Sequence, residues 1–373
     1  LGSIDEDISN LHFIFSLLFR RLLMKLFTPI SIGALELKHR MIMVPCGVNM
    51  ASPDSFISDR QYRYYQRLAR GGLALLIVEA AAVRADRKAI PCQVGVYSDT
   101  FIPGLQKLVD LIHAEGSLAA LQIMDPLMAA DKVPSDLTVN EIHQLVEDFA
   151  QAARRVREAG FDSVEFHMAH MYALADFLSK KTNTRKDEYG GDLKGRMRIV
   201  EEILGRSREL LGSDYPILCR INADEFMVGG NTLLQSRPIA QRLVELGADC
   251  IDVSAGGRPG AEGPRSYNAF RTVPTADMPD ATNAYLAAAI KKVVSVPVIT
   301  AGKIGTPDVA EEVLQEGQAD LIGLGRPLFA DPDFPQKTLE GSWDDIFQCR
   351  FCNRCMVLVW KGESVVCVHS DRW

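Results

Sequence analysis

The stretch "PVITAGKIGTPDVAEEVLQEGQADLIGLGRP", residues 297–327, contains a strand, helix and strand pattern. Aliphatic runs within 296–301 and 321–325 flank a segment whose apolar residues recur at helical spacing, with charged residues between them and a glycine near its end. Such a pattern is typical of parallel strands joined by an amphipathic helix. The stretch therefore predicts one βα repeat.

The same alternation recurs from Arg40 onward, with a further helical pattern over residues 140–160. Eight strands is the number of a (β/α)₈ barrel. The sequence therefore predicts an α/β fold, a (β/α)₈ TIM barrel with an outer ring of helices. The predicted strands are Met41–Pro45, Leu75–Ala80, Leu118–Ile123, Ser163–His167, Ile217–Ile221, Cys250–Ser254, Val296–Ala301 and Leu321–Gly325.

Length and composition fit one large catalytic domain. The chain has 373 residues, is 47% hydrophobic and carries a formal net charge of −7. Barrels of ~250 residues commonly form one domain, and an acidic balance gives no electrostatic footprint for nucleic acid. Four of the eight cysteines are scattered through apolar runs, unlike the disulfide framework of a small secreted domain. We therefore expect a cytoplasmic enzyme with a small-molecule substrate and no nucleic-acid partner.

Three segments are predicted along the chain. Residues 1–23 are expected to be an amphipathic extension or an artificial remnant, because the apolar run His12–Phe19 is far shorter than the ~20 residues of a membrane span. No membrane role is expected. The barrel is predicted over 24–333, and a cysteine-rich segment over 334–373 is expected to pack onto it.

The loops after the seventh and eighth predicted strands, "TAGKIGTPD" and "GLGRP", are candidates for binding a phosphate group. In TIM barrels these loops often bind phosphate through backbone amides. Gly302 and Gly325 would allow close backbone approach, and Lys303 and Arg326 would bring positive charge. Ordinary barrel turns are the alternative interpretation.

The stretch "CRFCNRCMVLVWKGESVVC", residues 349–367, has the spacing C-x2-C-x2-C-x11-C. Three cysteines at three-residue intervals with a distant fourth favour an iron–sulfur cluster, whereas zinc prefers two separated pairs. Zinc remains the alternative. The candidate ligands are Cys349, Cys352, Cys355 and Cys367.

From about Met24 to Cys367 the sequence resembles the Old Yellow Enzyme superfamily of FMN-dependent oxidoreductases. "CRFCNRC" makes it most similar to the branch that contains 2,4-dienoyl-CoA reductase and trimethylamine dehydrogenase. The resemblance implies FMN across the carboxyl rim of the barrel and a [4Fe–4S] cluster on the four cysteines. Besides residues 297–335, it is carried by "LFTPISIGALELKHRMIMVP" (26–45), "GGLALLIVEA" (71–80) and "GFDSVEFHMAHMYALADFLSKKTNTRKDEYGG" (160–191).

Position by position, the resemblance also implies the flavin contacts. Gln122 could donate to and accept from the pyrimidine edge, and Arg220 could stabilise negative charge on the reduced ring. A salt bridge at the end of a strand is the alternative role for Arg220. We expect noncovalent FMN, with covalent attachment at Cys46 as the alternative. The implied contacts are Pro45, Cys46, Gly47, Ala80, Gln122 and Arg220.

The hexapeptide "HMAHMY", residues 167–172, follows the fourth predicted strand. His167 and His170 could donate hydrogen bonds to a carbonyl oxygen that gains negative charge, and Tyr172 could donate a proton. The resemblance supports these catalytic roles. Because the family usually has glycines where Met168 and Met171 stand, we expect the two thioethers to crowd the substrate face.

The leading functional hypothesis is an ene reductase that transfers hydride from reduced FMN to the C=C bond of an α,β-unsaturated carbonyl compound, an enoate or enoyl thioester. NAD(P)H would supply electrons directly, or indirectly through an electron-donor protein or a further FAD and NAD(P)H domain. An amine dehydrogenase that passes electrons from FMN to the cluster is one alternative. A noncatalytic barrel with a zinc clip and a regulatory phosphate ligand is another. A homo-oligomer is also left open.

Overall fold

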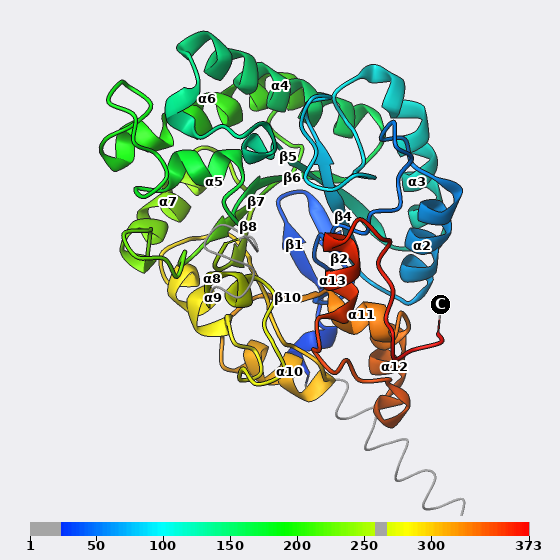
Figure 1. Ribbon diagram of the computed structural model, residues 1–373. Helices are drawn as coiled ribbons and strands as arrows, with labels where there is room; N and C mark the ends of the chain where they lie inside the picture. Colours follow the sequence, from blue (N-terminus) through cyan, green and yellow to red (C-terminus); the bar gives the residue numbers. More distant parts are fainter. Residues whose placement is uncertain (1–23, 258–266, 373) are drawn as a thin grey trace, which may run out of the picture.

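The computed structural model describes residues 24–257 and 267–372. Eight parallel strands close into a barrel in the order β10-β3-β4-β5-β6-β7-β8-β9, which confirms the predicted (β/α)₈ fold (Figure 1). The first strand is two residues shorter than predicted, and Pro45 has no N–H to donate to a ladder. The barrel strands are β3 (Met41–Met43), β4 (Leu75–Ala82), β5 (Leu118–Met124), β6 (Ser163–Met168), β7 (Ile217–Asn222), β8 (Cys250–Ser254), β9 (Val298–Ala301) and β10 (Leu321–Leu324).

Helices surround the barrel, and their starts follow local sequence signals. Thr138 and Glu141 form a capping box at the start of α4, and Thr306 caps α10 before Pro307. The α-helices are α2 (Asp59–Arg70), α3 (Ile102–Ala114), α4 (Val139–Glu158), α5 (Ala173–Leu178), α6 (Leu193–Leu211), α7 (Leu233–Glu245), α8 (Tyr267–Thr272), α9 (Ala284–Lys291), α10 (Pro307–Gln315), α11 (Arg326–Ala330), α12 (Phe334–Glu340) and α13 (Arg354–Trp360). Short 3₁₀ helices are η1 (Lys25–Phe27), η2 (Asp99–Phe101), η3 (Leu127–Ala130), η4 (Pro134–Asp136) and η5 (Trp343–Asp345).

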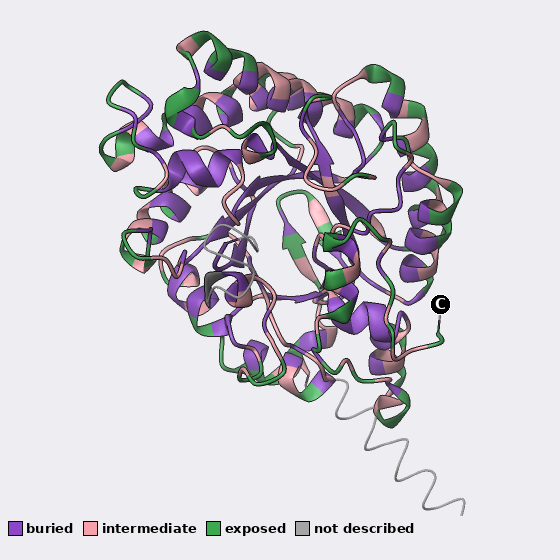
Figure 2. Ribbon diagram, viewed as in Figure 1, coloured by how far each residue is buried: buried purple, intermediate pink, exposed green. Residues whose placement is uncertain are grey.

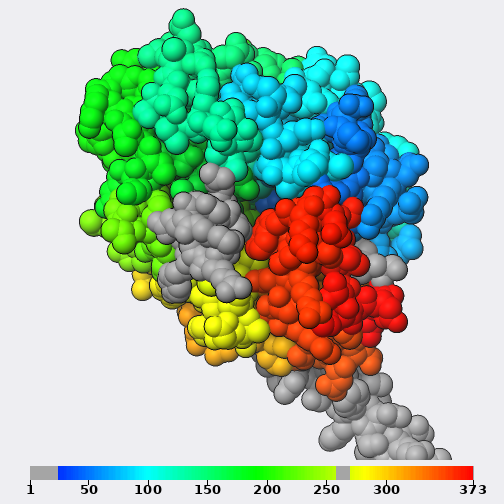
Figure 3. All heavy atoms as spheres, in the orientation of Figure 1, coloured from blue at the N-terminus to red at the C-terminus, as the bar shows by residue number. Residues whose placement is uncertain are grey.

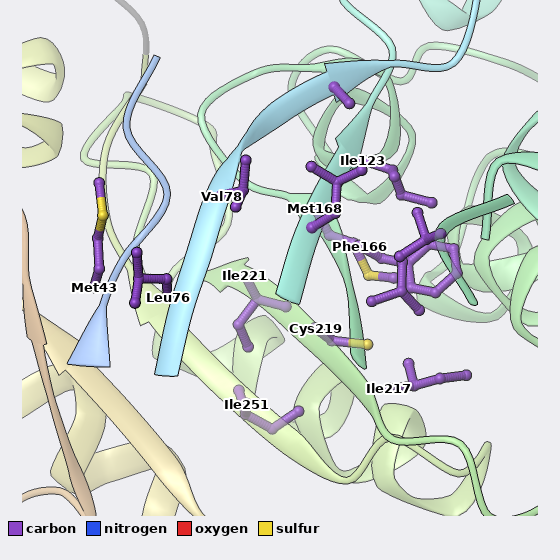
Figure 4. Close-up of a cluster of buried hydrophobic side chains, with 14 of the residues drawn as sticks. Met43, Leu76, Val78, Ile123, Phe166, Met168, Ile217, Cys219, Ile221 and Ile251 are labelled. Atoms are coloured by element: carbon purple, nitrogen blue, oxygen red, sulfur yellow. The ribbon is translucent and has the colours of Figure 1, made fainter. Parts of the chain in front are cut away.

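Successive strand residues point to opposite sides of the barrel wall and pack into two apolar layers. The outer layer lies between strands and helices and includes Phe166, Met168 and Ile221 (Figure 4). The inner layer fills the amino end of the barrel, where the antiparallel hairpin of β1 (Ile30–Ile32) and β2 (Leu35–Leu37) contributes to it. Figure 2 shows the buried strands inside helices whose outer faces are exposed. The inner layer comprises Ile32, Leu37, Ile42, Val44, Ala74, Leu75, Ile77, Ala120, Leu218, Cys250, Ile299 and Leu321.

The cysteine-rich segment lies against the carboxyl side of the barrel (Figures 1 and 3). The Val365 N–H donates to the Val48 carbonyl at 3.0 Å, and the Asn353 side chain donates to the Val273 carbonyl at 2.9 Å. The tail is thus hydrogen-bonded to loops that follow two different barrel strands.

The predicted extension, residues 1–23, lies outside the described residues. Within the described part of the chain, no helix combines the length and hydrophobicity that crossing a bilayer requires.

Candidate active site

A cavity of about 220 Å³ opens at the carboxyl end of the barrel. It is lined by every residue predicted for the flavin and for catalysis, although these residues come from seven strand ends and their loops. The predicted residues in the lining are Pro45, Cys46, Gly47, Ala80, Gln122, His167, His170, Tyr172, Arg220, Gly302, Lys303, Gly325 and Arg326.

The residues of the hexapeptide form a compact aromatic group at the end of β6. The ring centroid of His167 lies 5.0 Å from that of His170 and 5.0 Å from that of Tyr172. The His170 Nε2 atom is 2.6 Å from the Ser254 hydroxyl at the end of β8. The turn after β6 is therefore held against β8.

Both histidines are neutral over the physiological pH range. Burial holds the pKa of His167 and of His170 well below the usual 6.5, and the positive charge of Arg220 lowers both further. His167 Nδ1 accepts the Ala169 N–H at 3.3 Å, so its neutral ring carries its proton on Nε2. The site thus presents a neutral imidazole N–H donor next to a guanidinium.

The turn that contains His170 has an uncommon backbone. His170 and Met171 have φ values of 62° and 61°, the left-handed region that favours glycine. A bridge between His170 and Gly257 and the contact with Ser254 hold this conformation. Met168 instead packs outside the barrel wall (Figure 4). The expectation that it crowds the substrate face is therefore wrong, and Met171 is not among the residues that line the cavity either.

A layer of buried polar side chains forms the floor of the cavity. Gln122 Nε2 donates to Glu165 at 2.6 Å, and Arg220 pairs with Asp252 at 3.1 Å. Burial raises the pKa of Glu165 well above its usual value, and the nearby Asp252 charge adds to that rise. The Arg220 Nε atom is buried and has no hydrogen-bond partner among the described residues. The Asp252 pair is the salt bridge considered for Arg220, yet the guanidinium keeps this donor for a ligand.

The two loops predicted to bind phosphate meet at one side of the cavity. Gly302 has a φ of 122°, and a Cβ atom there would lie 2.9 Å from the Asn283 side chain. The Lys303 ammonium contacts the Ala276 and Met278 carbonyls, so its charge is partly engaged by a neighbouring loop. Arg326 donates to the Pro274 carbonyl at 2.6 Å.

The Cys46 thiol also lines the cavity. Burial raises its pKa to about 11, although Arg220 and Arg326 oppose the rise. A thiol that stays protonated is a weak nucleophile, which disfavours spontaneous attachment to a flavin ring.

All four cysteines of the C-terminal segment line a second, smaller cavity, together with Arg326 and Asn353. Within the described ranges, no three side chains of His, Cys, Asp or Glu are grouped tightly enough to hold a single ion. Four thiols are a donor set that an iron–sulfur cluster or a zinc ion can use. Arg326 lines this cavity as well as the main one, so the two cavities lie next to each other.

Several residues of the site were not predicted from the sequence. Glu165, Asp252 and Ser254 take part in the contacts described above, and Phe351 and Trp360 of the C-terminal segment line the main cavity. The strand residues follow from inward alternation with His167 and Arg220, a signal present in the sequence. The contribution of Phe351 and Trp360 depends on how the tail folds back.

Comparison with known proteins agrees with this geometry. The family model described as "NADH:flavin oxidoreductase / NADH oxidase family" matches residues 25–131 and 125–345. The NADH oxidase of Thermoanaerobacter brockii is 37% identical over 354 residues, which is 88% of this chain and 52% of the relative.

Two solved structures have closely similar folds. A 2-naphthoyl-CoA reductase in complex with 2-naphthoyl-CoA superposes with a TM-score of 0.86 at 29% identity, over 92% of this chain and 56% of that one. Histamine dehydrogenase from Rhizobium sp. 4-9 superposes with a TM-score of 0.80 at 26% identity, over 92% of this chain and 52% of the other. The chain thus spans about half the length of each of these relatives.

Proposed function

Because the chain belongs to the NADH:flavin oxidoreductase / NADH oxidase family, the Old Yellow Enzyme family of FMN-dependent oxidoreductases, we propose that it is an ene reductase. It would bind FMN noncovalently in the barrel cavity and reduce the C=C bond of an α,β-unsaturated carbonyl compound, an enoate or enoyl thioester. NAD(P)H is the proposed source of electrons, directly or through a partner, and the cytoplasm the proposed location.

The single observation that carries this proposal is the pair of neutral histidines next to Arg220 at the cavity wall. Reduction of a conjugated alkene builds negative charge on the carbonyl oxygen. Neutral imidazole N–H groups can stabilise that charge without giving up a proton prematurely. His167 on β6 and His170 in the turn that follows have ring centroids 5.0 Å apart, so both rings could contact one oxygen atom.

The cavity residues fit a flavin. Bound FMN would supply a hydride. Arg220 offers its unpartnered Nε donor, and Gln122 offers an amide that both donates and accepts. Gly302 and Gly325 line the cavity together with Arg326, so their backbone amides and this guanidinium are the proposed contacts of the phosphate. Tyr172, whose ring lies next to His167, is the proposed proton donor to the substrate carbon.

We further propose that the cysteines of residues 334–373 hold a [4Fe–4S] cluster. Four thiols that line one cavity next to the flavin cavity, three of them at three-residue intervals and the fourth distant in sequence, support this assignment over zinc. A cluster exchanges single electrons, which would let one-electron donors serve hydride chemistry.

An amine dehydrogenase is the second candidate, favoured by the fold shared with histamine dehydrogenase. The same histidines and tyrosine could orient an amine. In that case electrons would leave the substrate and pass outward through the cysteine segment.

Anaerobic spectroscopy and stopped-flow mixing test the proposal. We expect flavin bands on a broad shoulder near ~400 nm. We also expect the reduced protein to be reoxidised by an α,β-unsaturated ketone or enoyl thioester. Bleaching of the oxidised protein by amines, with no reoxidation by the unsaturated compounds, would favour the dehydrogenase. A colourless protein that contains zinc and no iron would overturn both.

A further inference from the structure

A groove of about 420 Å³ lies outside the proposed active site, between α2 and the last residues of the cysteine segment. Figure 1 shows the C-terminal residues, in red, running beside α2. We propose that this groove is the docking surface for a small acidic electron-carrier protein. The inference rests on the proposed cluster, because it concerns how electrons reach that centre.

Basic side chains dominate one wall of the groove. Arg60, Arg63, Arg67 and Arg70 all line it, and their spacing puts them on one face of α2. Among the described lining residues there is no carboxylate. A local run of arginines on a chain of net charge −7 marks this face as suited to an acidic partner.

The arginines divide into a fixed pair and an available pair. Arg67 binds Asp333 through two hydrogen bonds of 2.7 and 2.6 Å, and Arg70 binds Glu115 at 2.9 Å. These contacts neutralise two charges and hold the wall in place. Arg60 and Arg63 are exposed, and neither forms an ion pair or hydrogen bond within the described part of the chain. Their charges are therefore available to a partner.

The opposite wall is apolar. Phe329, Val365 and Val366 line the groove, and Val366 is 42% exposed. The neighbouring Val368 is 45% exposed as well. Apolar side chains at the centre with charges at the edge are the usual arrangement of a protein interface. A free phosphate or carboxylate would use the arginines and leave the valines without a role.

The groove lies next to the proposed cluster, so a protein bound in it could exchange electrons with that cluster. Cys367, a proposed cluster ligand, lines both this groove and the cysteine cavity. A carrier seated against Val366 would lie directly beside that ligand. Electrons could then reach the cluster without passing through the substrate cavity.

A plant-type [2Fe–2S] ferredoxin with an acidic surface serves as the probe. Its dissociation constant would be measured by calorimetry with wild-type protein and with the double variant Arg60→Glu/Arg63→Glu, at about 20 mM and about 0.5 M salt. The matched control, Lys194→Glu/Arg237→Glu, reverses two exposed charges on α6 and α7, away from the groove. Cluster reduction by dithionite and by reduced ferredoxin is followed by stopped flow.

We expect the Arg60/Arg63 variant to bind at least ~10-fold more weakly at low salt, with a much smaller difference at high salt. Its cluster should be reduced by ferredoxin correspondingly more slowly, while dithionite reduction and the control variant are unchanged. Equal binding by all proteins, equal losses in both variants, or tight pyrophosphate binding in place of ferredoxin would overturn the proposal. A colourless protein that still bound ferredoxin through Arg60 and Arg63 would refute the proposed function and leave the docking surface standing.

Discussion

At the amino end of the barrel, Ile32 and Leu37 of the β1–β2 hairpin join an apolar layer, whereas at the carboxyl end the inward positions carry Glu165, Arg220 and Asp252. The same strands supply both layers, a few residues apart. Burial of apolar groups stabilises the fold, while burial of charged groups costs free energy unless they are fully paired. The apolar layer at the amino end therefore stabilises the barrel, whereas the charged side chains at the carboxyl end lower its stability and are available for binding and catalysis.

The largest expected effect tests the amino end. Leu218 is fully buried in the inner apolar layer. We expect Leu218→Ala to lower the free energy of unfolding by about 2–5 kcal/mol, because it leaves a cavity. Urea denaturation measures this change. Leu234→Ala, at a site that is 76% exposed, should stay within about 0.5 kcal/mol of wild type.

Native Leu218→Ala protein should keep its flavin content. Loss of flavin at unchanged stability would contradict the division between the two ends.

At the carboxyl end, His167→Ala should act on chemistry. Removing one donor to a developing oxyanion slows such reactions by roughly 10²–10³-fold. Reoxidation of the reduced protein by an unsaturated ketone, followed by stopped flow, measures this. Met168→Ala is the matched control, because its neighbouring side chain packs on the other side of the wall. Met168→Ala should lower the free energy of unfolding and leave the reoxidation rate nearly unchanged. If Met168→Ala slowed reoxidation and His167→Ala only lowered stability, the two sides of the barrel wall would not have separate roles.

A buried carboxyl near the cavity tests the cost of polar burial. Burial raises the pKa of Glu79 from 4.5 to about 7. Below pH 4.5 the Glu79 carboxyl is protonated in both the folded and the unfolded protein, so the free-energy cost of burying its charge is absent. The cost grows as the pH rises and is complete above about 7, on the order of 3 kcal/mol. We expect Glu79→Gln to flatten this fall in the free energy of unfolding between pH 5 and 8. An unchanged pH profile would argue against the raised pKa.

The smallest expected effect concerns Ser254, which contacts His170 at 2.6 Å. Ser254→Ala should slow substrate reduction by about 10-fold, the worth of one hydrogen bond, by loosening the imidazole. The loss should fall mainly on kcat. Ser254→Thr, which keeps the hydroxyl, should restore most of the rate. A KM effect alone would assign Ser254 to substrate binding instead of histidine positioning.

The sequence predicted the barrel because each strand carries its own signal. Aliphatic runs such as Leu75–Ala80 and Ile217–Ile221 can satisfy burial on both faces inside a parallel sheet covered by helices, and eight such runs are the number of a (β/α)₈ barrel. The β1–β2 hairpin was not predicted, because two three-residue strands lack a distinctive period. Its position in the barrel depends on tertiary packing that no local pattern specifies.

The candidate site could be predicted residue by residue only through the family resemblance. Residue chemistry suggested the histidines and the cysteines, and strand alternation could have added Asp252 and Ser254. The Met168 expectation failed because parity in a strand, not sequence proximity to His167, decides which side of the wall a side chain faces. The Arg60–Arg63 groove could not be predicted, since it exists only where the tail meets α2.

The β1–β2 hairpin, which closes the amino end of the barrel with apolar side chains, has a consequence for the kinetics. With the amino end filled by Ile32 and Leu37, the described barrel offers its interior to solvent through the carboxyl mouth. A nicotinamide cofactor and an unsaturated substrate would both enter through this opening and would therefore bind one after the other. Such alternate binding gives ping-pong kinetics. Electrons delivered through the cysteine segment would not use this opening, so they could reduce the flavin while a ligand occupies the cavity.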